Sequence, residues 1–414
     1  MKKLIWATGA GALALTTGLL LGAGDAASQA TPAGTVHYEM DVGTASGMGI
    51  SAFGGGGVNI GALLSGRANE PRKELYLRLG SPQATPPNPA AQHFMPAGAR
   101  LGASVPLVTP TRAPDSERET IPGQESGERP SGRILLFWGC GAHAPAGQPV
   151  VIDLARISAG QVPTGLFSTS IPRDRSVSFA NSRTYGDWPN GRSNAQVSAQ
   201  SSLIGAHRVA GNYSPDIAFD LTQDFMPAIT ARSAANTDGS MNLSWNAIAQ
   251  ATGYYAWTMG FRSNGRGSGG DIVWWTSSAS QQFGGGLWDW MSPATVANLV
   301  RQRVVLPPAT TSCTVPAEVR AAAPDAMFGN LYAYGPEADF AYPPRPANAR
   351  TPWRPIWTAR VRYRANTSWM VGGPGDDAGE SASNGNQPAQ PNCRRRRGGL
   401  GGVLGGVLGG GNGC

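Results

Sequence analysis

The chain has 414 residues, of which 57 are glycine and 33 are proline. Both residue types interrupt helices, so their abundance excludes a coiled coil or a bundle of long helices. Hydrophobic residues make up 41%, which is enough for a packed core and excludes disorder throughout. The formal net charge of +7 is concentrated near the two ends, so the central part is nearly neutral and we expect no nucleic-acid-binding face.

Residues 1–30 are typical of a secretory signal peptide. Two lysines precede an uncharged apolar stretch over residues 4–22, and Ser28 and Ala30 suit the positions before a cleavage site. We therefore predict an exported protein of the periplasm, the outer membrane surface or the extracellular space of a bacterium. The alternative is a retained membrane anchor, since the apolar stretch is close to the length that spans a bilayer.

Residues 31–108 are predicted to form a β- and glycine-rich N-terminal region. Strands are expected at 35–42 and 74–79, because leucines alternate with polar residues in the second of these segments. The glycine-rich segment 43–66 between them lacks the Gly-Lys-Ser/Thr ending of a phosphate-binding loop, so we interpret it as a turn or flexible loop. Residues 109–132 are rich in proline and polar residues and are predicted to be a linker.

Residues 133–372 are predicted to form one or more β-rich domains. The continuous apolar run 134–138 indicates a strand buried on both faces, and a second strand is expected at 150–154. Short aromatic and β-branched segments separated by turn residues follow, which is typical of an antiparallel β-sandwich or barrel. One short helix is predicted at 293–303, where Ser292 can cap the first turn. Closing strands are expected near residues 361–363 and 369–371.

Residues 373–414 are predicted to be a disordered tail rich in arginine and glycine. The run Arg394, Arg395, Arg396 and Arg397 is expected to make at most a weak contact with an anionic surface. The closing GGLGGVLGGVLGGG repeat has too few apolar residues to span a membrane and too much glycine for a stable helix. Membrane association and self-association through this repeat are the alternatives.

Four cysteines are present, and export would place them in an oxidising compartment. We predict a disulfide between Cys140 and Cys313, which both lie in ordered-looking sequence. A second bridge between Cys393 and Cys414 is left open, because four cysteines allow three connectivities. Cys140 and His143 also have metal-ligand chemistry, but no second ligand pair lies nearby, so neither a metal nor a cofactor is expected.

The segment 207–224 contains the residues that best suit catalysis. Asp216 and Asp220 offer a carboxylate pair for general acid and base work on a glycosidic bond, with His207 nearby in the sequence. The same carboxylates, with Asn212, suit a calcium ion. The competing interpretation is that they are turn residues and strand ends, where aspartate and asparagine are common.

The chain contains 12 tryptophans. Five of them lie near loop-forming residues and are candidates for aromatic platforms that bind sugar rings or partner surfaces: Trp188, Trp274, Trp275, Trp288 and Trp290. The alternative is that they fill the core of a glycine-rich β fold.

Residues 241–260 carry a resemblance to a known family. Trp245 lies on one expected strand, and the sequence Ala-Thr-Gly-Tyr at 251–254 leads into the next. The segment resembles the paired early strands of a fibronectin type III domain, in which a core tryptophan precedes an Ala-x-Gly-Tyr sequence. The resemblance extends loosely over residues 213–306 and implies an embellished immunoglobulin-like β-sandwich. A tryptophan and a tyrosine on facing strands would fill such a core, so Trp245 and Tyr254 are expected to pack together.

These observations favour a mainly β, non-enzymatic, exported binding or structural protein of the cell envelope. Its expected partner is an envelope glycan or another envelope protein, bound through the aromatic-rich loops. The first alternative is a secreted glycosidase-like hydrolase that uses Asp216 and Asp220. The second is a membrane-associated assembly factor that acts through the glycine-rich tail.

Overall fold

The computed structural model describes residues 34–47, 71–110, 131–158, 161, 171, 176–190, 193, 195–263, 269–283, 285–348 and 350–371. All of them belong to one compact unit, Pro32–Cys414. The predicted signal peptide, the tail 373–414 with its four consecutive arginines, and the open Cys393–Cys414 pairing lie outside the described residues.

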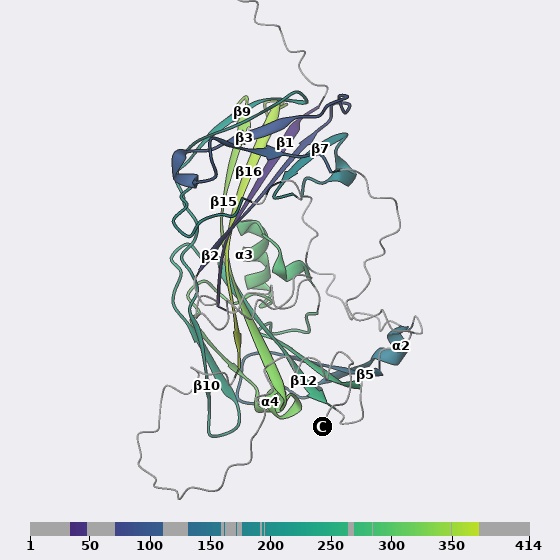
Figure 1. Ribbon diagram of the computed structural model, residues 1–414. Helices are drawn as coiled ribbons and strands as arrows, with labels where there is room; N and C mark the ends of the chain where they lie inside the picture. Colours follow the sequence, from purple (N-terminus) through teal and green to yellow (C-terminus); the bar gives the residue numbers. More distant parts are fainter. Residues whose placement is uncertain are drawn as a thin grey trace, which may run out of the picture. The chain divides into compact units, whose positions relative to one another are not determined.

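The protein is mainly β, as the sequence predicts, and its largest sheet has nine strands in the order β6-β5-β13-β12-β15-β16-β1-β2-β7. Neighbouring strands are antiparallel except for β1 with β16 and β13 with β5, which are parallel. The longest strands, β15 and β16, lie side by side as one hairpin (Figure 1). The nine strands are β1 (Val36–Gly47), β2 (Arg72–Ser81), β5 (Ser131–Trp138), β6 (Val150–Asp153), β7 (Thr184–Trp188), β12 (Gly253–Ser263), β13 (Gly269–Thr276), β15 (Ala326–Tyr342) and β16 (Trp357–Met370).

Two smaller antiparallel sheets accompany the large one, in the orders β10-β11-β14 and β4-β3-β8-β9. Their strands are β3 (Ala91–Phe94), β4 (Ser104–Leu107), β8 (Gly205–Gly211), β9 (Ser214–Leu221), β10 (Ala231–Ala235), β11 (Met241–Trp245) and β14 (Ser312–Val315). The α-helices are α2 (Leu154–Ser158), α3 (Pro293–Arg301) and α4 (Ala317–Ala322), and 3-10 turns occupy Ala97–Ala99, Phe179–Asn181 and Gly285–Trp288.

The predicted helix is confirmed as α3. The Ser292 hydroxyl accepts a hydrogen bond from the Thr295 N–H at 3.2 Å, and Pro293 occupies the first turn, where its missing N–H costs nothing. Val296 and Leu299 are the buried residues of its amphipathic face. The sequence did not predict α2 and α4, which have only 5 and 6 residues and too little length for a helical period.

Strand alternation sets the two faces of the large sheet. In β2 the leucines at 75, 77 and 79 are buried on one face, whereas Tyr76 and Arg78 lie on the other, as the sequence predicts. The predicted strand 134–138 is buried on both faces and corresponds to β5. By contrast, β1 continues to Gly47, so it includes the first residues of the predicted loop 43–66; the rest of that segment lies outside the described residues.

The two faces of the large sheet belong to different hydrophobic cores. On one face, Met40 and Val361 share a core with Leu243 and Ile217 from the two smaller sheets. On the other face, a second core packs against α3 and the segment before it, and it includes Tyr255, Trp257, Trp274, Val296 and Leu299. The large sheet is therefore covered on both sides along part of its width.

Trp245 and Tyr254 lie in contact, as the sequence predicts. Their ring centroids are 5.5 Å apart, and the two residues belong to different sheets, β11 and β12. The Tyr254 hydroxyl also accepts a hydrogen bond from the Ile248 N–H at 3.0 Å. The pair therefore joins the three-stranded sheet to the nine-stranded one. Membership of the fibronectin type III family stays a prediction.

Strands on both sides of the predicted linker 109–132 belong to the same sheets. β1 and β2 lie in the sheet that contains β5, and β3 and β4 lie in one sheet with β8 and β9, where β3 pairs with β8. The segments 31–108 and 133–372 therefore fold together. Residues 111–130 lie outside the described residues.

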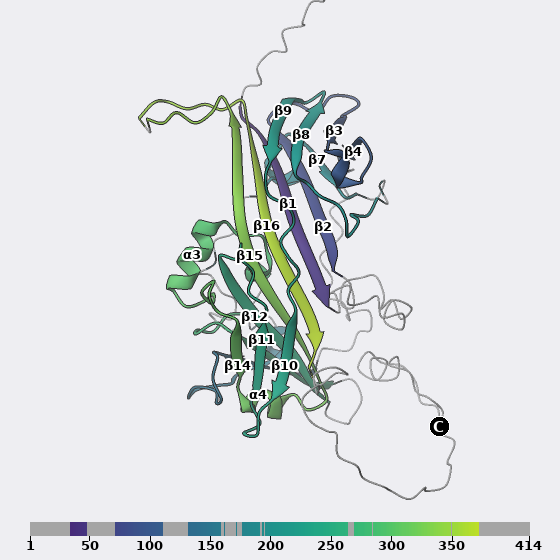
Figure 2. The same ribbon diagram turned by 90° about the vertical axis from the view of Figure 1, so that its left-hand side faces the viewer.

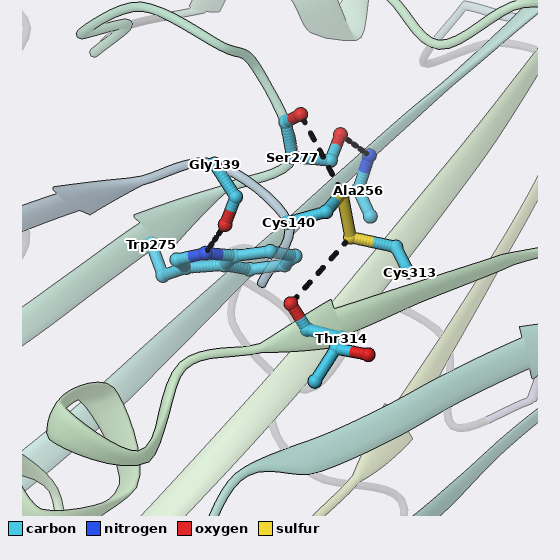
Figure 3. The surroundings of a disulfide bond; sticks show 7 residues. All are labelled: Gly139, Cys140, Ala256, Trp275, Ser277, Cys313 and Thr314. Atoms are coloured by element: carbon cyan, nitrogen blue, oxygen red, sulfur yellow. Dashed lines mark hydrogen bonds between the residues drawn. A yellow bond between two sulfur atoms is a disulfide. The ribbon is translucent and has the colours of Figure 1, made fainter. Parts of the chain in front are cut away.

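The predicted disulfide between Cys140 and Cys313 is present, with Cα atoms 5.3 Å apart (Figure 3). Cys140 follows β5 of the nine-stranded sheet, and Cys313 lies in β14 of the three-stranded sheet. The Trp275 indole N–H donates to the Gly139 carbonyl at 2.9 Å, and the Gly141 N–H donates to the Thr314 carbonyl at 2.9 Å. The bridge and the Gly141–Thr314 hydrogen bond hold the two sheets together at one point, and the Trp275 contact fixes the segment that carries Cys140.

Candidate functional site

The predicted catalytic residues are not brought together. β9 alternates between buried and exposed side chains, so Asp216 and Asp220 are exposed, whereas His207 on β8 lies buried on the opposite face. Asp216 accepts hydrogen bonds from Arg208 at 2.7 and 3.0 Å, an exposed ion pair. Four residues of strand separate the two carboxylates by about 13 Å, which exceeds the spacing of a glycosidase pair. The structure therefore does not gather these three residues into one catalytic site.

Asn212, a calcium ligand in the hypothesis for the same segment, uses its side chain for backbone contacts. The Asn212 carboxamide oxygen accepts from the Ala90 N–H at 3.0 Å, and its amide group donates to the Asn88 carbonyl at 2.7 Å. Asn212 is therefore a turn residue, as the competing interpretation proposed. Across the described ranges, no three His, Cys, Asp or Glu side chains gather in a way that would hold a metal ion.

Three of the five candidate tryptophans are core residues. Trp188, Trp274 and Trp275 are 2%, 5% and 0% exposed, so they present no ring to a ligand. Trp274 stacks on Trp257 with centroids 4.7 Å apart and an interplanar angle of 11°. Only Trp288 and Trp290 of the predicted set keep part of their surface in contact with solvent.

The part of the large sheet beside Trp290 carries charged side chains on one face. Alternate residues of β16, β1 and β2 point to the same side there, because they are direct partners in the sheet register. We call this surface the arginine face and define it by Glu39, Asp41, Arg78, Arg360, Arg362 and Arg364. It lies on the opposite side of these strands from Met40, Leu77 and Val361.

Asp41 and Arg362 form the most buried ion pair of the arginine face. Arg362 Nε lies 2.8 Å from Asp41 Oδ1 and Arg362 Nη2 lies 3.0 Å from Oδ2, so the contact is bidentate. Their side chains are 1% and 3% exposed. Arg78 also donates to Asp41, at 2.5 Å. Such geometry compensates for the desolvation of the two charges.

Glu39 is held in the same way by a second set of donors. Arg360 donates to its Oε1 atom, and the Val177 N–H donates to Oε2 at 3.0 Å. Arg78 lies 3.8 Å from the same carboxylate. Both acidic side chains of the arginine face are therefore committed to structural contacts.

Trp290 forms the accessible rim of the arginine face. Its ring meets the edge of Tyr76 at a centroid distance of 5.4 Å, and the Arg364 guanidinium lies 3.7 Å from its centroid. Its indole N–H donates to the Val42 carbonyl at 3.3 Å. A Cβ atom at Gly43 would lie 3.3 Å from the Trp290 ring, so glycine allows this close approach. These contacts fix the orientation of a ring that stays partly open to solvent.

Asp289 adds an accessible carboxyl group next to this ring. It is exposed and forms no ion pair or side-chain hydrogen bond with a described residue. Partial burial raises the pKa of Asp289 above its ordinary value, and the neighbouring Asp41 charge raises it further, while Arg364 opposes both effects. We call Tyr76, Asp289, Trp290 and Arg364 the Trp290 rim.

The sequence contained part of this signal. Trp290 was a candidate, and arginine alternates with apolar residues at 360–364, the pattern of a strand with one polar face. What the sequence did not show is that β16 pairs in parallel with β1, more than 300 residues away, which places Glu39 and Asp41 opposite these arginines.

Comparisons of the chain with protein-family models, curated proteins and solved structures found no match. Within the described part of the chain, no helix is both long and apolar enough to cross a membrane.

Proposed function

We propose that the protein is a non-enzymatic, exported binding or structural component of a bacterial cell envelope, and that it binds a glycan at the Trp290 rim. The observation that carries the proposal is the fixed, partly open Trp290 ring beside the uncommitted Asp289 carboxyl group. An indole face packs against the apolar face of a sugar ring, and a carboxylate accepts hydrogen bonds from sugar hydroxyls.

Export is supported by two independent features. Residues 1–30 have the order of a secretory signal peptide. The Cys140–Cys313 disulfide joins two sheets, and structural disulfides persist in oxidising compartments.

A binding role rather than catalysis is supported by the state of the charged groups. A general acid or base must lie within reach of a substrate proton. Glu39 and Asp41 are buried and bonded to arginines, and Asp216 and Asp220 lie on the other face of their strand pair from His207. Glu39 and Asp41 therefore have a structural role, and Asp216 and Asp220 are surface residues.

The proposal is tested by the retention of the mature chain on isolated peptidoglycan and on a panel of neutral and acidic oligosaccharides. We expect at least one sugar to be retained, with a loss of tenfold or more in affinity for Trp290→Ala and for Asp289→Asn. Asp220→Asn is the matched control, because it removes an exposed carboxylate from β9, which packs on the opposite side of the large sheet from the rim, and it should bind like the parent chain.

Two results would overturn the proposal. The first is retention that neither rim variant changes, which would place the ligand elsewhere. The second is release of shortened sugar products by the parent chain, which would show an enzyme. Equal unfolding midpoints for Asp289→Asn and the parent chain ensure that a loss of binding is not a loss of fold.

A further inference from the structure

A second cationic and aromatic surface lies at the turn of the β15–β16 hairpin. Residues 343–356 contain three arginines, five prolines and one tryptophan, and no acidic residue. Figure 2 shows this connection projecting beyond the strands that it joins. We call residues 343–348 and 350–356 the hairpin tip. It shares no residue with the Trp290 rim.

Hydrogen bonds fix the conformation of the hairpin tip. At its base the Ile356 N–H donates to the Tyr342 carbonyl at 2.7 Å, and the Trp353 indole N–H donates to the Pro343 carbonyl at 3.0 Å. In its central turn, Asn348 accepts from the N–H groups of Arg350 and Thr351, both at 3.0 Å. The prolines restrict the backbone further. The side chains of the tip are therefore carried on an ordered loop.

The three arginines of the tip are exposed and carry unneutralised charge. Arg345, Arg350 and Arg354 form no ion pair with any residue that the structure describes. The Arg345 guanidinium lies 5.4 Å from the centroid of the Trp353 ring. Stacking on an aromatic face orients a guanidinium group and leaves its N–H edge free for an oxyanion.

Arg345, Arg350 and Trp353 border an open hollow of about 350 Å³, within the range of small-ligand sites. Its lining combines the guanidinium groups of Arg345 and Arg350 with the Trp353 indole, and with Asn348 and Thr351. Guanidinium groups bind carboxylate or phosphate oxygens in a bidentate manner. An indole ring packs against the apolar face of a sugar ring, and amide and hydroxyl groups form hydrogen bonds with sugar hydroxyls.

We propose that the hairpin tip binds an acidic polysaccharide through carboxylate or phosphate groups on its sugar rings. The lining favours a sugar polymer over a lipid surface, because Asn348 and Thr351 line it beside the arginines and its one large apolar side chain, Trp353, is held at the Pro343 carbonyl. This site is independent of the Trp290 rim.

The test measures the affinity of the full mature chain for polygalacturonate and for phosphomannan, which separate carboxylate from phosphate recognition. Neutral dextran and phosphatidylglycerol vesicles are the comparison probes. The test variant is Arg345→Gln/Arg350→Gln/Arg354→Gln. The control variant is Arg72→Gln/Arg156→Gln/Arg232→Gln, which removes the same charge from exposed positions elsewhere. The arginine run 394–397 is present in both.

We expect the tip variant to lose tenfold or more in affinity for at least one acidic polysaccharide, and the control variant to stay within twofold of the parent chain. Equal losses in the two variants would overturn the proposal, because they would show a response to net charge alone. Vesicle binding that depends on the tip while the polysaccharides do not bind would also overturn it. The loss that the tip variant causes should be the same fold-change in the Trp290→Ala background as in the parent chain, so failure of the rim proposal and failure of the tip proposal are distinguishable.

Discussion

His93 Nε2 lies 2.9 Å from His207 Nδ1 in the buried space between the nine-stranded and four-stranded sheets. His207 Nε2 lies 2.7 Å from the Leu203 carbonyl oxygen, which can only accept, so this nitrogen carries a proton. In a neutral ring His207 Nδ1 then accepts from His93 Nε2–H. His93 Nδ1 in turn accepts from the Tyr38 hydroxyl, at 2.6 Å.

This chain of hydrogen bonds joins three strands. Tyr38 lies on β1, His93 on β3 and His207 on β8. Phe219 stacks on the His207 ring at 5.3 Å and packs against Phe340 of β15, so the surroundings are largely apolar. The charge of Asp220, on the outer face of β9, raises the pKa of His207 and so opposes the effect of burial. All ring nitrogens of the two histidines therefore have hydrogen-bond partners inside the core, and His207 has no free nitrogen for a substrate.

The first prediction concerns the tautomers. Nitrogen NMR of the folded chain labelled with ¹⁵N-histidine should show His93 and His207 as neutral rings protonated at Nε2, because the Leu203 carbonyl fixes the direction of every donor in the chain. Tyr38→Phe removes the last donor and should change the shift of His93 Nδ1 while His207 keeps its tautomer. A signal from an Nδ1–H form of His207 in the parent chain would contradict the assignment.

The second prediction concerns pH. Burial lowers the pKa of His93 well below its usual value, helped by His207, and burial also lowers the pKa of His207. Below about pH 6.5 the histidines bind protons in the unfolded state, whereas in the folded state they stay neutral at the same pH. The free energy of unfolding should therefore fall as the pH drops below about 6.5, by at most about 1.4 kcal/mol per pH unit for each histidine.

Denaturant titrations between pH 8 and 5 measure this slope. His93→Gln/His207→Gln should be less stable at pH 8, because the hydrogen-bond chain is lost, and should have a shallower slope below about pH 6.5. Three carboxyl groups have pKa values that burial raises, so their titration increases the free energy of unfolding as the pH falls: Asp187, Asp289 and Glu337. They are present in both proteins and therefore do not change the comparison. Parallel slopes for the two proteins would show that the histidines do not set the acid response.

Local patterns in the sequence predicted the strands but not the surroundings of their faces. Trp274 and Trp275 are consecutive in β13, so they point to opposite faces. Both are buried because one face packs toward α3 and the other belongs to the core shared with the smaller sheets. Nearby glycine, asparagine and aspartate residues suggested that these tryptophans lie near loops, but their exposure depends on which layers pack against the two faces of β13.

The same limit applies to the charged residues. Alternation correctly indicates that residues 360–364 carry a polar face, but a polar face is ordinarily solvated. Its burial depends on the register between β16 and β1, which no local sequence pattern specifies. Where both partners are close in the sequence, as for Trp245 and Tyr254, the contact was predictable. The Cys140–Cys313 bridge was predictable because only two cysteines lie in ordered-looking sequence.

The third prediction separates the buried ion pair from an exposed one. Asp41→Asn leaves the Arg362 guanidinium buried without its counter-charge, so the free energy of unfolding should fall by about 3–5 kcal/mol. Asp216→Asn breaks an exposed pair with Arg208 and should cost less than about 1 kcal/mol. Denaturant unfolding at pH 7.5 measures both. Similar costs for the two variants would contradict the burial of the arginine face.

The fourth prediction concerns the disulfide. Cys140 and Cys313 are separated by 173 residues, so the bridge restricts a long loop in the unfolded chain, and its removal should lower the free energy of unfolding by about 5 kcal/mol. Cys140→Ser/Cys313→Ala and reduction of the parent chain should have similar effects, because both release the β14 sheet from β5. Cys393→Ser/Cys414→Ser is the matched control and should leave the unfolding transition of the described β unit unchanged. If the reduced parent chain unfolded at the same denaturant concentration as the oxidised chain, the bridge would not stabilise the contact between the two sheets. The bridge would then also no longer support export.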